Sequence, residues 1–222
     1  MIAASRRLLH WRAAISLAVL LPGSLQASEH LDFQRLFTRA AELYRIDSRA
    51  DARLKAWQTL IESQRPATTP SRLDAVNRFF NRQLRFDDDK LIWGEPDYWA
   101  TPIESLIQGA ADCEDFAIAK YLSLKELGIP PEKLRLTYVK SIELDQAHMV
   151  LAWYATPSAE PLILDNLIDE ILPASRRPDL VPVYSFNTRG LWLAGGAQQI
   201  GSAQRLPRWQ DVQNKLRIEG FR

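Results

Sequence analysis

The sequence predicts an α+β fold, in which N-terminal helices and one later helix pack against an antiparallel sheet. Apolar residues recur at helical spacing through residues 31–64 and 71–84. After residue 134 the chain changes to short apolar runs that are typical of strands. Helices and strands that are segregated along a chain indicate this fold class. The chain has 222 residues, which is enough for one domain with a substantial core.

The first 27 residues have the pattern of a secretory signal peptide. Three arginines precede an apolar stretch at residues 13–21, and the segment ends at the small residue Ala27. The apolar stretch is shorter than the about 20 residues that span a membrane. We therefore expect residues 1–27 to be a signal peptide and residues 28–222 to be a single exported domain. An uncleaved amphipathic anchor is the alternative, because Leu25 stands where a small residue is preferred.

The charge excludes one class of partner. The whole chain has a formal net charge of +1, and the signal segment contains three arginines and no acidic residue. Residues 28–222 therefore carry a small negative charge. Nucleic-acid binding needs a clustered basic face, so we expect no nucleic-acid partner.

Residues 28–84 form the helical part of the predicted domain. Asp47 has the character of an N-cap and divides residues 31–64 into two helices. Pro66 and Pro70 then break the pattern before a third helix at residues 71–84.

Residues 85–222 hold the remaining elements. Residues 85–101 are expected to be irregular, and the acidic run from Asp87 to Asp89 is interpreted as a solvated turn. Asp97, next to an aromatic pair, is expected to reach the edge of an active site. A helix is expected from residue 113 to about 127. Strands are expected at residues 134–142, 149–155, 162–164 and 181–187, and a closing helix at residues 208–218.

Cys113 is the single cysteine of the chain and lies at the expected start of a helix. Asp112 fits the N-cap position, and Asp115 fits the acidic position of a capping box. Free N–H groups and the helix dipole favour a thiolate at this place. A lone cysteine is otherwise a small buried apolar residue, which is the alternative interpretation.

A cysteine nucleophile needs a histidine and a group that orients it. Of the three histidines, His10 lies in the signal segment and His30 soon after it, whereas His148 precedes a convincing strand. Asp165 ends the apolar run 162–164. Two neighbouring antiparallel strands would place His148 beside Asp165. The alternatives are that His148 is only a hydrogen-bonded surface residue and that Asp165 only marks an ordinary turn.

The acidic residues around Cys113 conflict with a thiolate. Asp112, Glu114 and Asp115 would each raise the pKa of a nearby thiol. A bound cation would remove the conflict, and carboxylate oxygens suit Ca²⁺. The alternative is that these residues only cap the helix and face water.

Four segments resemble the bacterial transglutaminase-like cysteine proteinases, relatives of the papain architecture; they are residues 98–102, 109–121, 147–151 and 164–166. The resemblance implies a papain/transglutaminase-like fold with the catalytic residues Cys113, His148 and Asp165. It also implies calcium dependence, with Asp112 and Glu114 as ligands.

The same resemblance implies a biological role. It predicts a periplasmic endopeptidase that cleaves the N-terminal region of a large surface adhesin at a small-residue site and so releases it from a biofilm. It further predicts an inner-membrane cyclic di-GMP receptor as the inhibitory partner. Two alternatives stay open: a transglutaminase-type acyl transferase with the same triad, and a non-enzymatic module that binds a partner on this fold.

Overall fold

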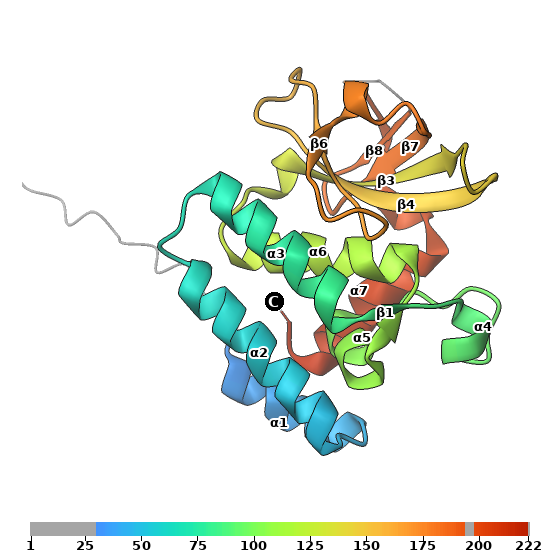
Figure 1. Ribbon diagram of the computed structural model, residues 1–222. Coiled ribbons are helices and arrows are strands. Elements are labelled where there is room, and N and C mark those ends of the chain that lie inside the picture. Colours follow the sequence, from blue (N-terminus) through green and yellow to red (C-terminus); the bar gives the residue numbers. More distant parts are fainter. Residues whose placement is uncertain (1–29, 194–197, 222) are drawn as a thin grey trace, which may run out of the picture.

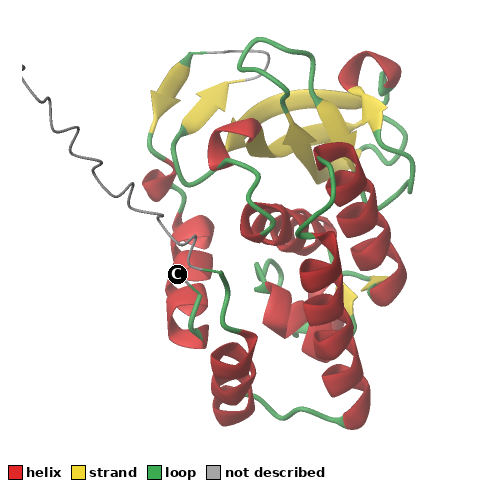
Figure 2. Ribbon diagram, turned by 90° about the vertical axis from the view of Figure 1, so that its left-hand side faces the viewer, coloured by secondary structure: helices red, strands yellow, loops and turns green. Residues whose placement is uncertain are grey.

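The computed structural model describes residues 30–193 and 198–221, and it confirms the predicted α+β class. Helices gather on one side of a seven-stranded antiparallel sheet (Figures 1 and 2). The predicted signal peptide lies outside the described residues. Within the described ranges, no helix has the length and apolar character needed to cross a membrane.

The three N-terminal helices agree with the sequence pattern. They are α1 (Phe33–Leu43), α2 (Ser48–Gln64) and α3 (Thr69–Gln83). Asp47 caps α2 as expected, because its side chain accepts the N–H of Ala50 at 2.7 Å. Helix α3 starts two residues earlier than expected, since Pro70 fits the first turn, where no N–H donor is required.

The segment that was expected to be irregular contains two short elements, strand β1 (Arg85–Phe86) and helix α4 (Asp89–Ile92). Helix α5 (Pro102–Gln108) follows and was not predicted. Strand β2 (Ala110–Ala111) pairs in parallel with β1. This pairing places the end of β1 beside the start of the next helix.

Helix α6 (Cys113–Glu126) is the centre of the domain, and residues 115–124 are all buried. It lies between the N-terminal helices and the sheet (Figure 1). On the helical side, the buried Trp57 donates from Nε1 to Ser123 Oγ at 2.9 Å. Gly128 follows α6 with φ of 82°, a conformation that favours glycine and ends the helix, as the sequence predicts.

The sheet has the strand order β6-β5-β4-β3-β7-β8-β9. Its strands are β3 (Leu134–Ser141), β4 (Gln146–Trp153), β5 (Leu162–Leu164), β6 (Leu172–Pro173), β7 (Leu180–Phe186), β8 (Leu191–Leu193) and β9 (Gln199–Gly201). Strands β6, β8 and β9 were not predicted, because two or three residues are too few to show a periodicity; β5 is equally short and was predicted from the apolar run that ends at Asp165.

Strand β4 begins three residues before its expected start. Its pairing with β3 extends to Gln146, opposite Ser141. The turn between the strands is short, and Asp145 adopts φ of 47°, which lets the ladder continue to this point. His148 therefore lies within the first residues of β4, not before the strand. Helix α7 (Pro207–Glu219) closes the domain as predicted.

Candidate active site

Cys113 is the first residue of α6, as the sequence predicts. Asp112 is the N-cap, and its side chain accepts the N–H of Asp115 at 3.4 Å. The expected capping box is wrong in its second half. The carboxylate of Asp115 is fully buried and accepts the N–H of Ala100 at 2.6 Å. It therefore anchors the segment around Ala100 and does not bond back to the N-cap of α6.

The electrostatic conflict at Cys113 is present in the structure. Burial raises the pKa of the Cys113 thiol well above its usual value, and Glu114 and Asp112 raise it further. The sulfur lies 3.1 Å from Glu114 Oε2, so the thiol donates to that carboxylate. The backbone N–H of Met149 has the opposite effect on this pKa, because it favours the sulfur anion. Without a compensating cation, the site therefore favours the thiol.

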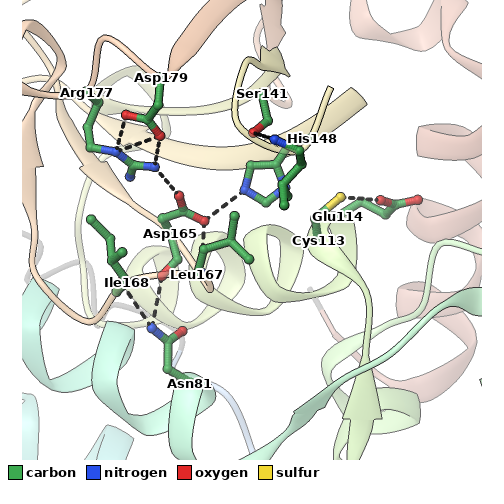
Figure 3. Close-up of polar contacts among 11 residues, drawn as sticks. Asn81, Cys113, Glu114, Ser141, His148, Asp165, Leu167, Ile168, Arg177 and Asp179 are labelled. Atoms are coloured by element: carbon green, nitrogen blue, oxygen red, sulfur yellow. Dashed lines mark hydrogen bonds and ion pairs between the residues drawn. The ribbon is translucent and has the colours of Figure 1, made fainter. Parts of the chain in front are cut away.

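His148 and Asp165 lie side by side on β4 and at the end of β5. His148 Nε2 is 2.8 Å from Asp165 Oδ1, and both side chains are buried. The imidazole ring lies between Asp165 and Cys113 (Figure 3). Because Nε2 faces the carboxylate, Nδ1 is the ring nitrogen that remains for exchange of a proton with the sulfur.

Asp165 has further partners that the sequence did not reveal. Its Oδ1 accepts the N–H of Leu167 at 3.1 Å, and its Oδ2 accepts Arg177 Nη2 at 2.7 Å. Asn81 Nδ2 donates to the backbone carbonyl of Asp165 at 2.9 Å. Burial alone would raise the pKa of Asp165, but hydrogen bonds from His148 and Arg177 lower it to about 2. Asp165 is therefore a carboxylate at all physiological pH values.

Cys113 and His148 line the same cleft, which has a volume of about 420 Å³. Its walls include aromatic side chains from three parts of the chain, namely Trp99, Tyr138 and Tyr184. Asp97 lies at the cleft as the sequence predicts, and its Oδ2 is 3.1 Å from Arg208 Nε.

Three carboxylates meet next to Cys113. Asp89, Asp112 and Glu114 each offer an oxygen, and these oxygens lie within 4.8 Å of one another. Asp112 and Glu114 are the ligands that the resemblance implies, whereas the prediction of a solvated turn at Asp89 is wrong. Asp89 is 3% exposed, and its Oδ1 has no hydrogen-bond partner among the described residues. Asp87, two residues earlier, is partly exposed and forms an ion pair with Arg85.

These residues fit a divalent cation. Burial raises the pKa of Asp112, Glu114 and Asp89, and mutual repulsion takes that of Asp112 to about 11. One buried and two partly buried carboxylates at this separation repel one another strongly when all are ionised, and a bound positive charge would remove that repulsion. Ca²⁺ binds carboxylate oxygens, and Asp89 Oδ1 is a buried oxygen without a hydrogen-bond partner among the described residues. The donor set is therefore suited to calcium.

Comparison with known proteins agrees with this geometry. Residues 47–192 match the family described as bacterial transglutaminase-like cysteine proteinase, BTLCP. The chain belongs to this family. Among curated protein sequences, none gives a significant match.

Solved structures of a LapG protein share the fold. The EGTA-treated form of Legionella pneumophila LapG is 42% identical, with a TM-score of 0.75, and the match covers 84% of this chain and 98% of that one. The calcium-bound form is 41% identical, with a TM-score of 0.72, and the match covers 84% and 99% of the two chains. The fold is therefore transglutaminase-like, as the resemblance implied.

Proposed function

We propose that this cysteine proteinase is a calcium-dependent endopeptidase with the triad Cys113, His148 and Asp165. The observation that carries the proposal is the shared cleft. The sulfur at the start of α6 and the imidazole of β4 both line it, and the imidazole is anchored to Asp165 at 2.8 Å. A nucleophile, a base and a group that orients the base are the parts that thiol catalysis requires.

The geometry supports the following sequence of steps. His148 Nδ1 takes the thiol proton while the sulfur of Cys113 attacks the peptide carbonyl. The N–H of Cys113, at the free end of α6, is placed to stabilise the oxyanion. The imidazolium then protonates the leaving amine, and water, deprotonated by His148, hydrolyses the thioester. Throughout, Asp165 holds the ring by the Nε2 hydrogen bond.

Asp89, Asp112 and Glu114 would hold the calcium ion. When bound, the ion would supply positive charge beside a group of carboxylates that otherwise disfavours a sulfur anion. The similarity to LapG supports this part of the proposal, because that protein has a calcium-bound structure. The pKa values raised by burial and repulsion support it independently.

The proposed substrate is the N-terminal region of a large surface adhesin, cut in the periplasm at a small-residue site such as a di-alanine. The proposed inhibitory partner is an inner-membrane cyclic di-GMP receptor. Two observations support both proposals: the resemblance of the triad segments to the family, and the 42% sequence identity to Legionella pneumophila LapG over 84% of this chain.

The test is cleavage of an adhesin N-terminal fragment by residues 28–222, as wild type and as Cys113→Ala. We expect wild type to release a hydrolysed fragment, EGTA to stop the release and added calcium to restore it. We expect Cys113→Ala to be inactive. Full activity of Cys113→Ala would refute the protease, whereas full activity in EGTA would refute only the calcium dependence. Cross-linked products with an added amine would indicate an acyl transferase, and binding without cleavage by wild type would indicate a binding module.

A further inference from the structure

Arg177 joins the candidate triad to a second acidic residue. It follows the short 3-10 helix η2 (Ala174–Arg176) and is 6% exposed. Its Nη2 lies 2.7 Å from Asp165 Oδ2 and 2.7 Å from Asp179 Oδ2, and its Nε donates to Asp179 Oδ1 at 3.0 Å. The close-up shows the resulting chain from Asp179 through Arg177 and Asp165 to the imidazole (Figure 3).

The two oxygens of Asp165 have different partners. Oδ1 accepts from His148 Nε2 and from the N–H of Leu167, whereas Oδ2 accepts from Arg177 Nη2. Bonds to Oδ1 alone would leave the carboxylate able to turn about that oxygen. The guanidinium fixes the second oxygen, and therefore the plane in which the first one meets the imidazole.

Asp179 in turn fixes the guanidinium. Its carboxylate receives both Nε and Nη2, a two-point contact that sets the plane of the Arg177 fork. The elements involved are η2, the loop before β7, the end of β5 and strand β4. These groups, at one end of the strands, thus hold the imidazole on the side away from Cys113.

We propose that Arg177 is a positioning residue for the triad, which keeps His148 in the tautomer that carries its proton on Nε2 and presents Nδ1 to Cys113. The proposal rests on the proposed function above. Arg177 touches neither sulfur nor substrate in this arrangement, so it acts through Asp165. Partners that orient metal-ligating histidines in this way typically contribute about 10–100-fold when they are removed, and we expect a similar effect here.

The test uses Arg177→Gln, which removes the charge, and Arg177→Lys, which retains it. Arg176→Gln is the matched control, because Arg176 is the adjacent arginine and is exposed. For Arg177→Gln we expect kcat to fall about 10–100-fold while KM changes little. Arg177→Lys should recover part of the loss, and the control should match wild type.

A second measurement does not depend on substrate. Residues 28–222 contain two histidines, His30 and His148, so the ¹⁵N spectrum of histidine-labelled protein reports the tautomer of each ring. We expect the Nε2–H form of His148 in wild type, in Arg177→Lys and in the control, and a mixture of tautomers in Arg177→Gln. Wild-type kcat or an unchanged tautomer in folded Arg177→Gln would overturn the proposal. If Arg177→Gln fails to fold, wild-type kcat in Arg177→Ala would overturn it, and a loss recovered by Arg177→Lys would support it.

The two proposals fail separately. Activity of Cys113→Ala would remove the protease mechanism, yet the tautomer measurement would still decide what Arg177 does to His148. Conversely, an inactive Cys113→Ala together with normal catalysis by Arg177→Gln would leave the triad standing and remove only the role of Arg177.

Discussion

Calcium should stabilise the folded domain, and Asp89 should be required for the effect. The oxygens of Asp89, Asp112 and Glu114 lie within 4.8 Å of one another, so each ionised pair repels by about 3.5 kcal/mol at an effective dielectric constant of about 20. Three such pairs give about 10 kcal/mol, which is comparable with the whole stability of a domain. The metal-free protein must therefore keep protons on this cluster, and a cation can replace them.

The size of the expected shift follows from binding linkage. Calcium at about 100 times its dissociation constant stabilises the folded state by about 2.7 kcal/mol. For a domain of this size that corresponds to an increase in Tm of about 5–11 °C. Asp89→Asn removes one charged ligand. If affinity falls about 100-fold, the remaining stabilisation is about 0.4 kcal/mol, or about 1–2 °C.

The assay is thermal unfolding in EGTA and in calcium. In EGTA, Asp89→Asn should melt at or above wild type, because one source of repulsion is gone, and in calcium it should melt below wild type. Asp87→Asn is the control, since Asp87 pairs with Arg85 outside the carboxylate cluster and its variant should keep the full shift. A full calcium shift in Asp89→Asn would show that Asp89 is not a ligand. No shift in wild type would remove the cation site itself.

The sign of the pH dependence gives a further check on the same assay. The pKa of Asp112 is about 11 in the metal-free fold, far above its ordinary value. The folded state therefore binds a proton that the unfolded state releases above about pH 4, and metal-free stability falls as pH rises. The calcium shift should consequently grow from pH 6 to pH 8. A shift that shrinks over this range would contradict the account.

Three other changes have defined outcomes. Asp165→Asn should lower kcat by about 10³–10⁴-fold, measured on the adhesin fragment with folding followed by circular dichroism, because the imidazole loses the carboxylate that fixes its tautomer. Burial raises the pKa of Glu219 to about 7, so its stabilising contribution is lost as pH rises through 7. Urea unfolding should show this as a fall in the free energy of unfolding of about 3 kcal/mol, and Glu219→Gln should flatten the slope. Burial lowers the pKa of Lys120 from 10.5 to about 7, so stability should rise with pH between these two values, and Lys120→Met should be about 2–4 kcal/mol more stable at pH 6. An unchanged slope in either variant would contradict the corresponding burial argument.

Local signals account for the parts of the site that the sequence predicted. Asp112 before Cys113 is an N-cap pattern read from adjacent residues, and the strand ends at His148 and Asp165 follow from the continuous apolar runs next to them. Helix α5 also carried a local signal, since Thr101 and Glu104 form a capping box, but the segment is too short for an apolar period to support it.

Asp89 and Arg177 had no such signal. Asp89 stands in an acidic run that has the composition of a turn, and it reaches Asp112 only because β1 pairs in parallel with β2. That pairing involves two residues in each strand, which leaves no pattern in the sequence. Arg177 likewise meets Asp165 only through the tertiary fold, because the connection from β6 to β7 brings it to the end of β5, and its own neighbours in the chain do not distinguish it from the exposed Arg176.

The carboxylates near Cys113 hold the cleft wall as well as forming the proposed cation site. The N–H of Tyr98 donates to Asp89, and the N–H of Ala100 donates to Asp115. Trp99, between these two anchors, lines the cleft with Cys113. A change at Asp89 therefore acts on the cation site and on the position of Trp99 together. Glu114 has no such bond to this segment among the described residues, so Glu114→Gln should weaken calcium binding while leaving the wall in place. The KM of Asp89→Asn and of Glu114→Gln, each measured in saturating calcium, separates the two effects. A higher KM in Asp89→Asn alone would be due to the displaced cleft wall and not to the ion.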